Sequence, residues 1–248
     1  MNSNSKTVKT SPQFYAKTAG VLFLISILAG GFGELFVLNK LIVSGDATAT
    51  AINIHASTSL FRLGFASYLA EAVCDVSLTV ILYLLLRPVR KDIALLAAFF
   101  GLVSTVTFAF AELFYFAVLL LLDADYLKTF SPNQVNSLVL LSLKLYGYGA
   151  GIFMVFYGVA SILRGYLIFQ SGYLPKFLGI LLMLAGAGFV IRNFVLVLAP
   201  AYASDFLLLP MPLAILALAL WLLVKGVNVK KWNKQVSMES GREASTEI

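Results

Sequence analysis

Charged residues, histidine and cysteine are all scarce in this chain of 248 residues. Asp, Glu, Lys and Arg make up 12% of it, against about 25% in an ordinary soluble domain, and hydrophobic residues make up 60%. Disordered chains have the opposite composition, and a single cysteine cannot form a disulfide within the chain. The composition therefore excludes a disordered protein and a disulfide scaffold. It favours a protein whose solvent is largely lipid.

Several motifs of metal-dependent and ATP-dependent enzymes are missing from the chain. The only histidine is His55, and neither an H-E-x-x-H motif nor a Cys/His cluster is present, which disfavours a zinc protease or a haem bundle. No G-x-x-x-x-G-K-[ST] motif for ATP phosphates occurs. We predict no metal, no cofactor and no catalytic residue, although an enzymatic role stays open. The net charge of +6 requires no nucleic acid as partner, because the loops facing the cytoplasm account for it.

Six apolar segments are long enough to cross a bilayer, which takes about 20 residues. They do not alternate between polar and apolar residues as barrel strands do. We predict an all-α bundle of six transmembrane helices over residues 19–224, between an N-terminal tail, 1–18, and a flexible C-terminal tail, 225–248. The spans are 19–43, 63–86, 93–122, 138–163, 177–198 and 206–224.

Helix-start signals place two further boundaries. Ser131, Pro132 and Gln134 form an N-terminal capping pattern, so the fourth helix is expected to begin before the bilayer does. Asp46 is the expected cap of a short surface helix from Ala47 to about Ser59.

Lys and Arg residues in the loops predict the orientation. Thirteen of them fall on one side of the membrane, in the two tails and in the links after the second and fourth helices. The link after the fourth helix contains Arg164 and Lys176. Two fall on the other side. The positive-inside rule then places both termini in the cytoplasm of a cell-membrane protein, with the lipid bilayer as partner. The first apolar run is too long for a signal peptide, whose apolar region spans about 7–15 residues.

Polar residues within the spans are the candidate functional residues, because charge is costly in a membrane. A rise of about 1.5 Å per residue places most of them in the outer half of the bilayer, with Asp75 near the midplane. We expect an outward-facing pocket in which the acids pair with Arg192 and Lys144. The candidates are Glu34, Glu71, Asp75, Glu112, Lys144, Arg192, Asn193, Tyr115, Tyr146 and Tyr148.

Each candidate has a structural alternative. Lys144 and Glu112 can snorkel to the interface, and Asp75 can be a neutral group that holds helices together. Gly147, Gly151 and Gly158 share one face of the fourth helix, and we interpret them as a helix-packing surface. An unwound stretch at a binding site is the alternative for the first two.

Loop and helix-end motifs carry a resemblance to a known family. They are residues 16–23 (AKTAGVLF), 45–51 (GDATATA), 82–89 (LYLLLRPV) and 165–176 (GYLIFQSGYLPK). Over about residues 15–225 the chain resembles the "domain of unknown function 4386" family of bacterial multi-pass membrane proteins. The resemblance implies about six spans and a membrane location, and it implies no activity.

Three functions remain open from the sequence. The first is binding or movement of a small solute or proton through the outward-facing pocket. The second is a structural or assembly role in which buried charges only lock helices together. The third is a membrane-embedded lipid-modifying enzyme that uses the same acids.

Overall fold

The computed structural model describes residues 11–123 and 128–246, and within these ranges it contains helices and no strands. Six helical segments in this part of the chain are long and apolar enough to cross a membrane. This confirms the prediction of an all-α bundle with six spans. The segments are α1 (Pro12–Gly31) continuing through η1 (Phe32–Leu38) and α2 (Asn39–Leu41), α4 (Thr58–Leu86), α5 (Lys91–Leu122), α6 (Pro132–Ser171), α7 (Lys176–Leu198), and η4 (Asp205–Leu208) with α8 (Pro210–Val224).

Three shorter helices complete the described chain: α3 (Ala47–Ala56), η3 (Pro200–Tyr202) and α9 (Val229–Thr246). The Asp46 carboxylate accepts a hydrogen bond from the backbone N–H of Ala49 at 2.8 Å, so α3 begins where its cap predicts. The predicted cap of α6 is confirmed as a full capping box between Ser131 and Gln134.

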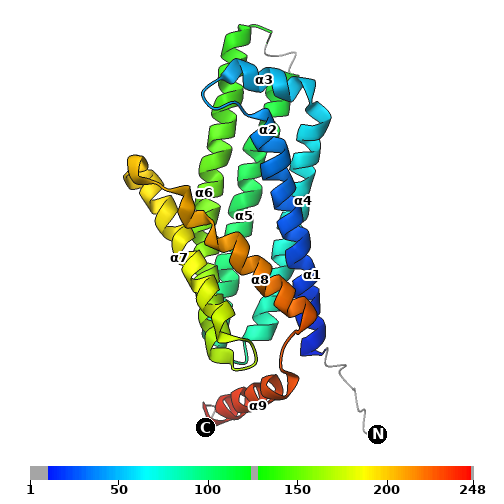
Figure 1. Ribbon diagram of the computed structural model, residues 1–248, viewed down its shortest axis with the longest axis vertical. Coiled ribbons are helices and arrows are strands. Elements are labelled where there is room, and N and C mark those ends of the chain that lie inside the picture. The colour runs from blue at the N-terminus through cyan, green and yellow to red at the C-terminus, as the bar shows by residue number, and fades with distance from the viewer. Residues whose placement is uncertain (1–10, 124–127, 247–248) are drawn as a thin grey trace.

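The start of α1 lies beside the end of α8. The Gln13 side chain donates to the carbonyl of Lys225 and accepts from the N–H of Val227, each at 3.1 Å. Figure 1 shows α9 at this same end of the bundle and α3 at the opposite end. We call them the tail end and the α3 end.

Several predicted boundaries differ from the structure. Helix α1 begins at Pro12, seven residues before the predicted span, because Ser11 caps it and proline suits the first helical position. Helix α6 continues to Ser171 and ends at Gly172, whose φ of 67° favours glycine. The predicted flexible tail instead carries α9. Lys6 and Lys9 of the predicted N-terminal tail lie outside the described residues.

Helix α9 is attached through the end of α4. The Leu85 carbonyl belongs to the last turn of α4, where helical partners run out. It accepts from the Tyr173 hydroxyl at 2.7 Å and from the Trp232 indole N–H at 3.1 Å. Burial raises the pKa of Tyr173, so its hydroxyl keeps the proton that it donates.

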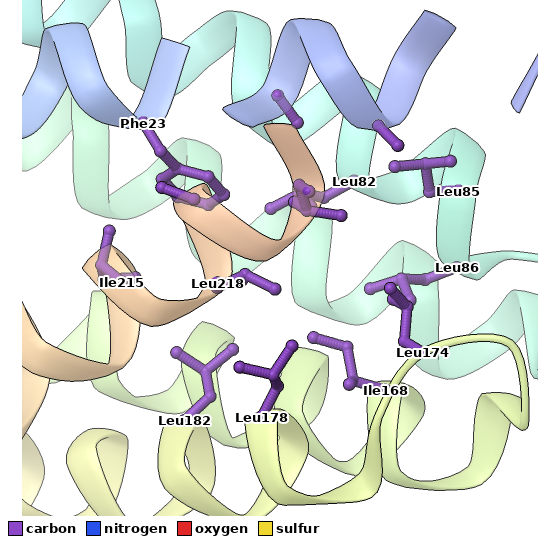
Figure 2. Close-up of a cluster of buried hydrophobic side chains, with 14 of the residues drawn as sticks. Phe23, Leu82, Leu85, Leu86, Ile168, Leu174, Leu178, Leu182, Ile215 and Leu218 are labelled. Atoms are coloured by element: carbon purple, nitrogen blue, oxygen red, sulfur yellow. The ribbon is translucent and has the colours of Figure 1, made fainter. Parts of the chain in front are cut away.

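The hydrophobic core has two parts. The tail-end cluster joins α1, α4, α6, α7 and α8 with the start of α5, and Figure 2 shows its leucines and isoleucines meeting inside the bundle. The α3-end cluster joins η1, α2, α3, α4, α5 and α6, and no residue that the structure describes in α7 or α8 belongs to it. Helices α7 and α8 are therefore packed tightly only in the tail-end half. This arrangement leaves room beside α6 in the other half.

Candidate functional site

A cavity of about 880 Å³ occupies the α3-end half of the bundle. Its walls come from the end of α1, η1, α4, α5, α6, α7 and η4. Glu34 and Glu71 lie on the side of η1 and α4, and Lys144, Arg192 and Asp205 lie on the side of α6, α7 and η4. The helices thus bring together acids and bases that are far apart in the sequence.

The acidic side depends on close approach between α4 and the end of α1. A Cβ on Gly30 would lie 2.6 Å from a carboxylate oxygen of Glu71, and one on Gly33 would lie 2.5 Å from the Tyr68 ring. Glycine at these positions lets both side chains lie against the backbone. The Tyr68 hydroxyl donates to Glu34 at 3.3 Å. Glu71 forms no hydrogen bond or ion pair with residues in the described ranges.

Glu34 lies in a π-helix. The N–H of Asn39 bonds to the carbonyl of Glu34, five residues earlier, which is the π-helical pattern. Such turns are rare and are found frequently at functional sites. The local backbone thus places Glu34 on the cavity by an irregular turn rather than by a continuous α-helix.

The basic side contains one paired and one unpaired cation. Arg192 forms an ion pair of 2.7 Å with Asp205 and donates to Asn193 at 3.2 Å. Lys144 has no ion pair within the part of the chain that the structure describes. The predicted pairing of Arg192 with the acids of the first two spans is therefore wrong, because η4 brings Asp205 to it. Asn193 is buried and touches the face of Gly151.

Asp75 lies outside this cavity, in a separate cluster toward the tail end. It accepts a hydrogen bond from Ser26 at 3.2 Å, and Arg164 donates to Thr79 at 3.1 Å in the same enclosed space. A Cβ on Gly101 would collide with the Arg164 guanidinium. The cluster is tight and polar, and it joins α1, α4, α5 and α6.

Arg164 is a residue that sequence reasoning misplaced. It was assigned to the link after the fourth helix, whereas it is buried seven residues before the end of α6. The sequence does contain a signal: the first proline after Leu163 is Pro175, shortly after Gly172, and Gly165 alone does not end the helix. A long helix then carries the arginine into the core.

The predicted tyrosines take different positions. Tyr146 lines the cavity together with Tyr68, which sequence reasoning missed although it lies one turn before Glu71. Tyr115 is fully buried behind them, stacked on Phe61 with ring centroids 4.1 Å apart. Tyr148 is 60% exposed on the outside of the bundle and does not line the cavity.

Lys144 and Glu112, the two residues expected to be able to snorkel, occupy different environments. Lys144 is exposed and lines the cavity. Glu112 is 1% exposed, so it neither reaches an interface nor lines the cavity. Its helix is turned so that this side chain points into the bundle rather than toward lipid. Snorkelling is therefore wrong for Glu112.

The three glycines of α6 do not form one packing surface. A Cβ on Gly158 would lie 2.7 Å from the carbonyl oxygen of Gly186 on α7, so this glycine permits close helix contact. Gly147 has no atom within 4 Å of the corresponding position, and it lines the cavity with Gly151. The packing interpretation is wrong for Gly147, since α7 has diverged from α6 at that height.

Metal-binding groups are not assembled in the described residues. Within 11–123 and 128–246, no group of three or more His, Cys, Asp or Glu side chains is placed to hold a metal ion. His55 is exposed on α3, and Cys74 is buried as a free thiol.

Comparisons with known proteins identify a family and no activity. The family model described as "Domain of unknown function (DUF4386)" matches residues 18–226. An uncharacterized protein of Archaeoglobus fulgidus is 32% identical over 120 residues, which cover 48% of this chain. The matched stretch is 58% of that relative's length. No solved structure matches the chain.

Proposed function

The chain belongs to the DUF4386 family, whose description names no activity, and from the site itself we propose that it binds a small zwitterionic solute in the cavity of its α3-end half. The description of the Archaeoglobus relative adds no substrate. The proposal therefore depends on the chemistry of the cavity walls.

The observation that carries the proposal is the size of the cavity together with its unpaired charges. A volume of about 880 Å³ lies within the usual range of ligand sites, about 300–1,000 Å³. Ionisable residues in membrane spans are costly and mark substrate or ion pathways. Glu71 and Lys144 both lie on the cavity without an ion-pair partner among the described residues, so each is free to pair with a charged group of a solute.

The arrangement of charge suggests the class of solute. Glu34 and Glu71 suit an ammonium group, and the nearby rings of Tyr68 and Phe108 add aromatic faces that attract cations. Lys144 and the Arg192 guanidinium, on the other side, suit a carboxylate or phosphate. A small molecule with both charges and an apolar portion, such as an amino acid, matches the two sides and the leucines between them.

The distribution of Lys and Arg residues supports access from outside the cell. Arg87, Arg90 and Lys91 lie at the tail end with Lys225 and the lysines of α9, and such residues favour the cytoplasmic face. We propose that the tail end is cytoplasmic and that the cavity faces outward. The tail-end cluster would then separate a bound solute from the cytoplasm, and transport would require this cluster to repack.

The structural alternative, in which buried polar groups only hold helices together, is favoured for the cluster around Asp75 and not for the cavity. Asp75, Ser26, Thr79 and Arg164 are all buried and occupy a space with no room for water. Their hydrogen bonds tie the helices together below the cavity. This part of the structural alternative is compatible with solute binding in the other half.

Thermal unfolding of the purified protein in detergent, with amino acids, amines and carboxylates added singly, tests the proposal. A zwitterion at about 100 times its Kd should stabilise the protein by about 2.7 kcal/mol and raise its melting temperature. Glu71→Gln and Lys144→Gln should each abolish the shift, whereas Tyr148→Phe, outside the cavity, should retain it. Equal shifts in all four proteins, or no shift with any zwitterion, would contradict the proposal.

A further inference from the structure

Glu112 is a buried acid whose oxygens have no partner. Its side chain is 1% exposed, and neither carboxylate oxygen accepts or donates a hydrogen bond within residues 11–123 and 128–246. An isolated carboxylate in an apolar interior costs far more free energy than its neutral acid. The geometry therefore suits a carboxyl group that carries a proton.

In the part of the chain that the structure describes, the titratable groups around Glu112 come from three helices and none is a cation. They are Tyr115 from α5, Tyr68 and Glu71 from α4, and Tyr146 from α6. The Tyr115 hydroxyl already donates to the carbonyl of Phe61 at 3.0 Å. Tyr146 is left as the polar neighbour of Glu112, although the two side chains form no hydrogen bond in this structure.

Tyr146 also connects Glu112 with the cavity. Its hydroxyl is within interaction range of the Tyr68 hydroxyl, and the two ring centroids lie 6.0 Å apart. Both rings line the cavity, and Tyr68 donates to Glu34. Hydroxyl groups thus lead stepwise from the buried acid to a carboxylate on the cavity wall.

We propose that Glu112 is a proton-binding site that exchanges its proton with the cavity through Tyr146 and Tyr68. In the transfer, the two side chains first come within hydrogen-bonding distance, the O–H bond of Glu112 breaks, and its proton goes to the Tyr146 oxygen. Tyr146 passes its own proton to Tyr68, and Tyr68 passes its proton to Glu34. Glu112 loses one proton, Glu34 gains one, and both tyrosines end as they began.

The effect of this proton on solute binding rests on the proposed function. A proton arriving at Glu34 removes negative charge from the wall that would receive an ammonium group. Proton release by Glu112 and solute occupation of the cavity would therefore oppose each other. This linkage is the kind of device that couples a proton to solute movement.

Infrared spectroscopy of the protein at neutral pH in a detergent without ester groups, and without any solute, tests the site. The spectrum should contain a carbonyl band of protonated carboxyl groups, and Glu112→Gln should remove one component of it. Asp92→Asn should leave the band unchanged, because Asp92 is exposed and paired with Arg90 at 2.8 Å. A band that is unchanged in Glu112→Gln would overturn the assignment.

Exchange into heavy water tests the route. The band should shift promptly in the parent protein and roughly tenfold or more slowly in Tyr146→Phe, which keeps the ring and removes the hydroxyl. Tyr148→Phe, on the outside of α6, should exchange as the parent does. An unchanged rate in Tyr146→Phe would overturn the route. This test can be made even if Glu112→Gln fails to fold. Since no solute is added, these outcomes are independent of whether the cavity binds one.

Discussion

Substitution of Gly158 with alanine should weaken the contact between α6 and α7. The added Cβ would lie 2.7 Å from the Gly186 carbonyl oxygen and 2.9 Å from a methyl carbon of Val190, against 3.4–4 Å for ordinary contact. The nearest atom is backbone, so the two helices must separate. Overpacking of this kind costs about 1–3 kcal/mol. Unfolding of the purified protein in detergent, followed by circular dichroism, measures the loss.

Gly147→Ala is a matched control on the same helix. Both substitutions gain the same helix propensity, about 1 kcal/mol, so this contribution cancels in the comparison. No atom lies within 4 Å of a Cβ at Gly147. Gly158→Ala should therefore be less stable than Gly147→Ala by about 1–3 kcal/mol. Equal stability of the two variants would refute the assignment of Gly158 to helix contact and of Gly147 to the cavity.

Two further predictions concern the Leu85 carbonyl, which accepts from two donors, and the exposed ion pair between Arg192 and Asp205. Tyr173→Phe and Trp232→Phe should each lower the free energy of unfolding by about 0.5–1.5 kcal/mol, and the double variant should lose more than the sum, because the Leu85 carbonyl then has no donor. Unfolding of the four proteins checks this, and additive losses would argue against a shared acceptor. A double-mutant cycle of Arg192→Ala and Asp205→Ala should give a coupling below about 1 kcal/mol, since the Asp205 side chain is 79% exposed. A much larger coupling would mean that this pair is shielded from water.

Hydropathy was sufficient to predict the six spans, because crossing a bilayer demands a length that few other structures require. Boundaries were harder. Ser11 and Pro12 start α1 inside a segment that was interpreted as a tail, and Gly172 rather than Leu163 ends α6. In both cases local capping chemistry, not hydropathy, decides where the helix begins or ends.

The height of a polar residue could be estimated from the sequence, whereas its direction around the helix could not. The sequence predicts Glu34, Glu71 and Arg192 in the outer half of the bilayer, and the structure places all three on one cavity. Glu112 faces other neighbours, because rotation of a helix about its axis depends on packing. Asp75 shares a helix face with Glu71 and lies one turn further toward the tail end, in the separate cluster. Two features set the direction of these side chains: the glycines against which Glu71 and Tyr68 pack, and the π-turn at Glu34. Composition reveals neither.

The account depends most on a cavity that is open to water from outside the cell. In a Cys74→Ala background, which has no other cysteine, single cysteines placed at Gly147 and at Val106 can be treated on intact cells with a charged, membrane-impermeant thiol reagent. Gly147 lines the cavity, whereas the Val106 side chain is 68% exposed on the outside of the bundle, where lipid would surround it. The account predicts modification at Gly147→Cys and none at Val106→Cys. Modification of Gly147→Cys only after the cells are permeabilised would contradict it.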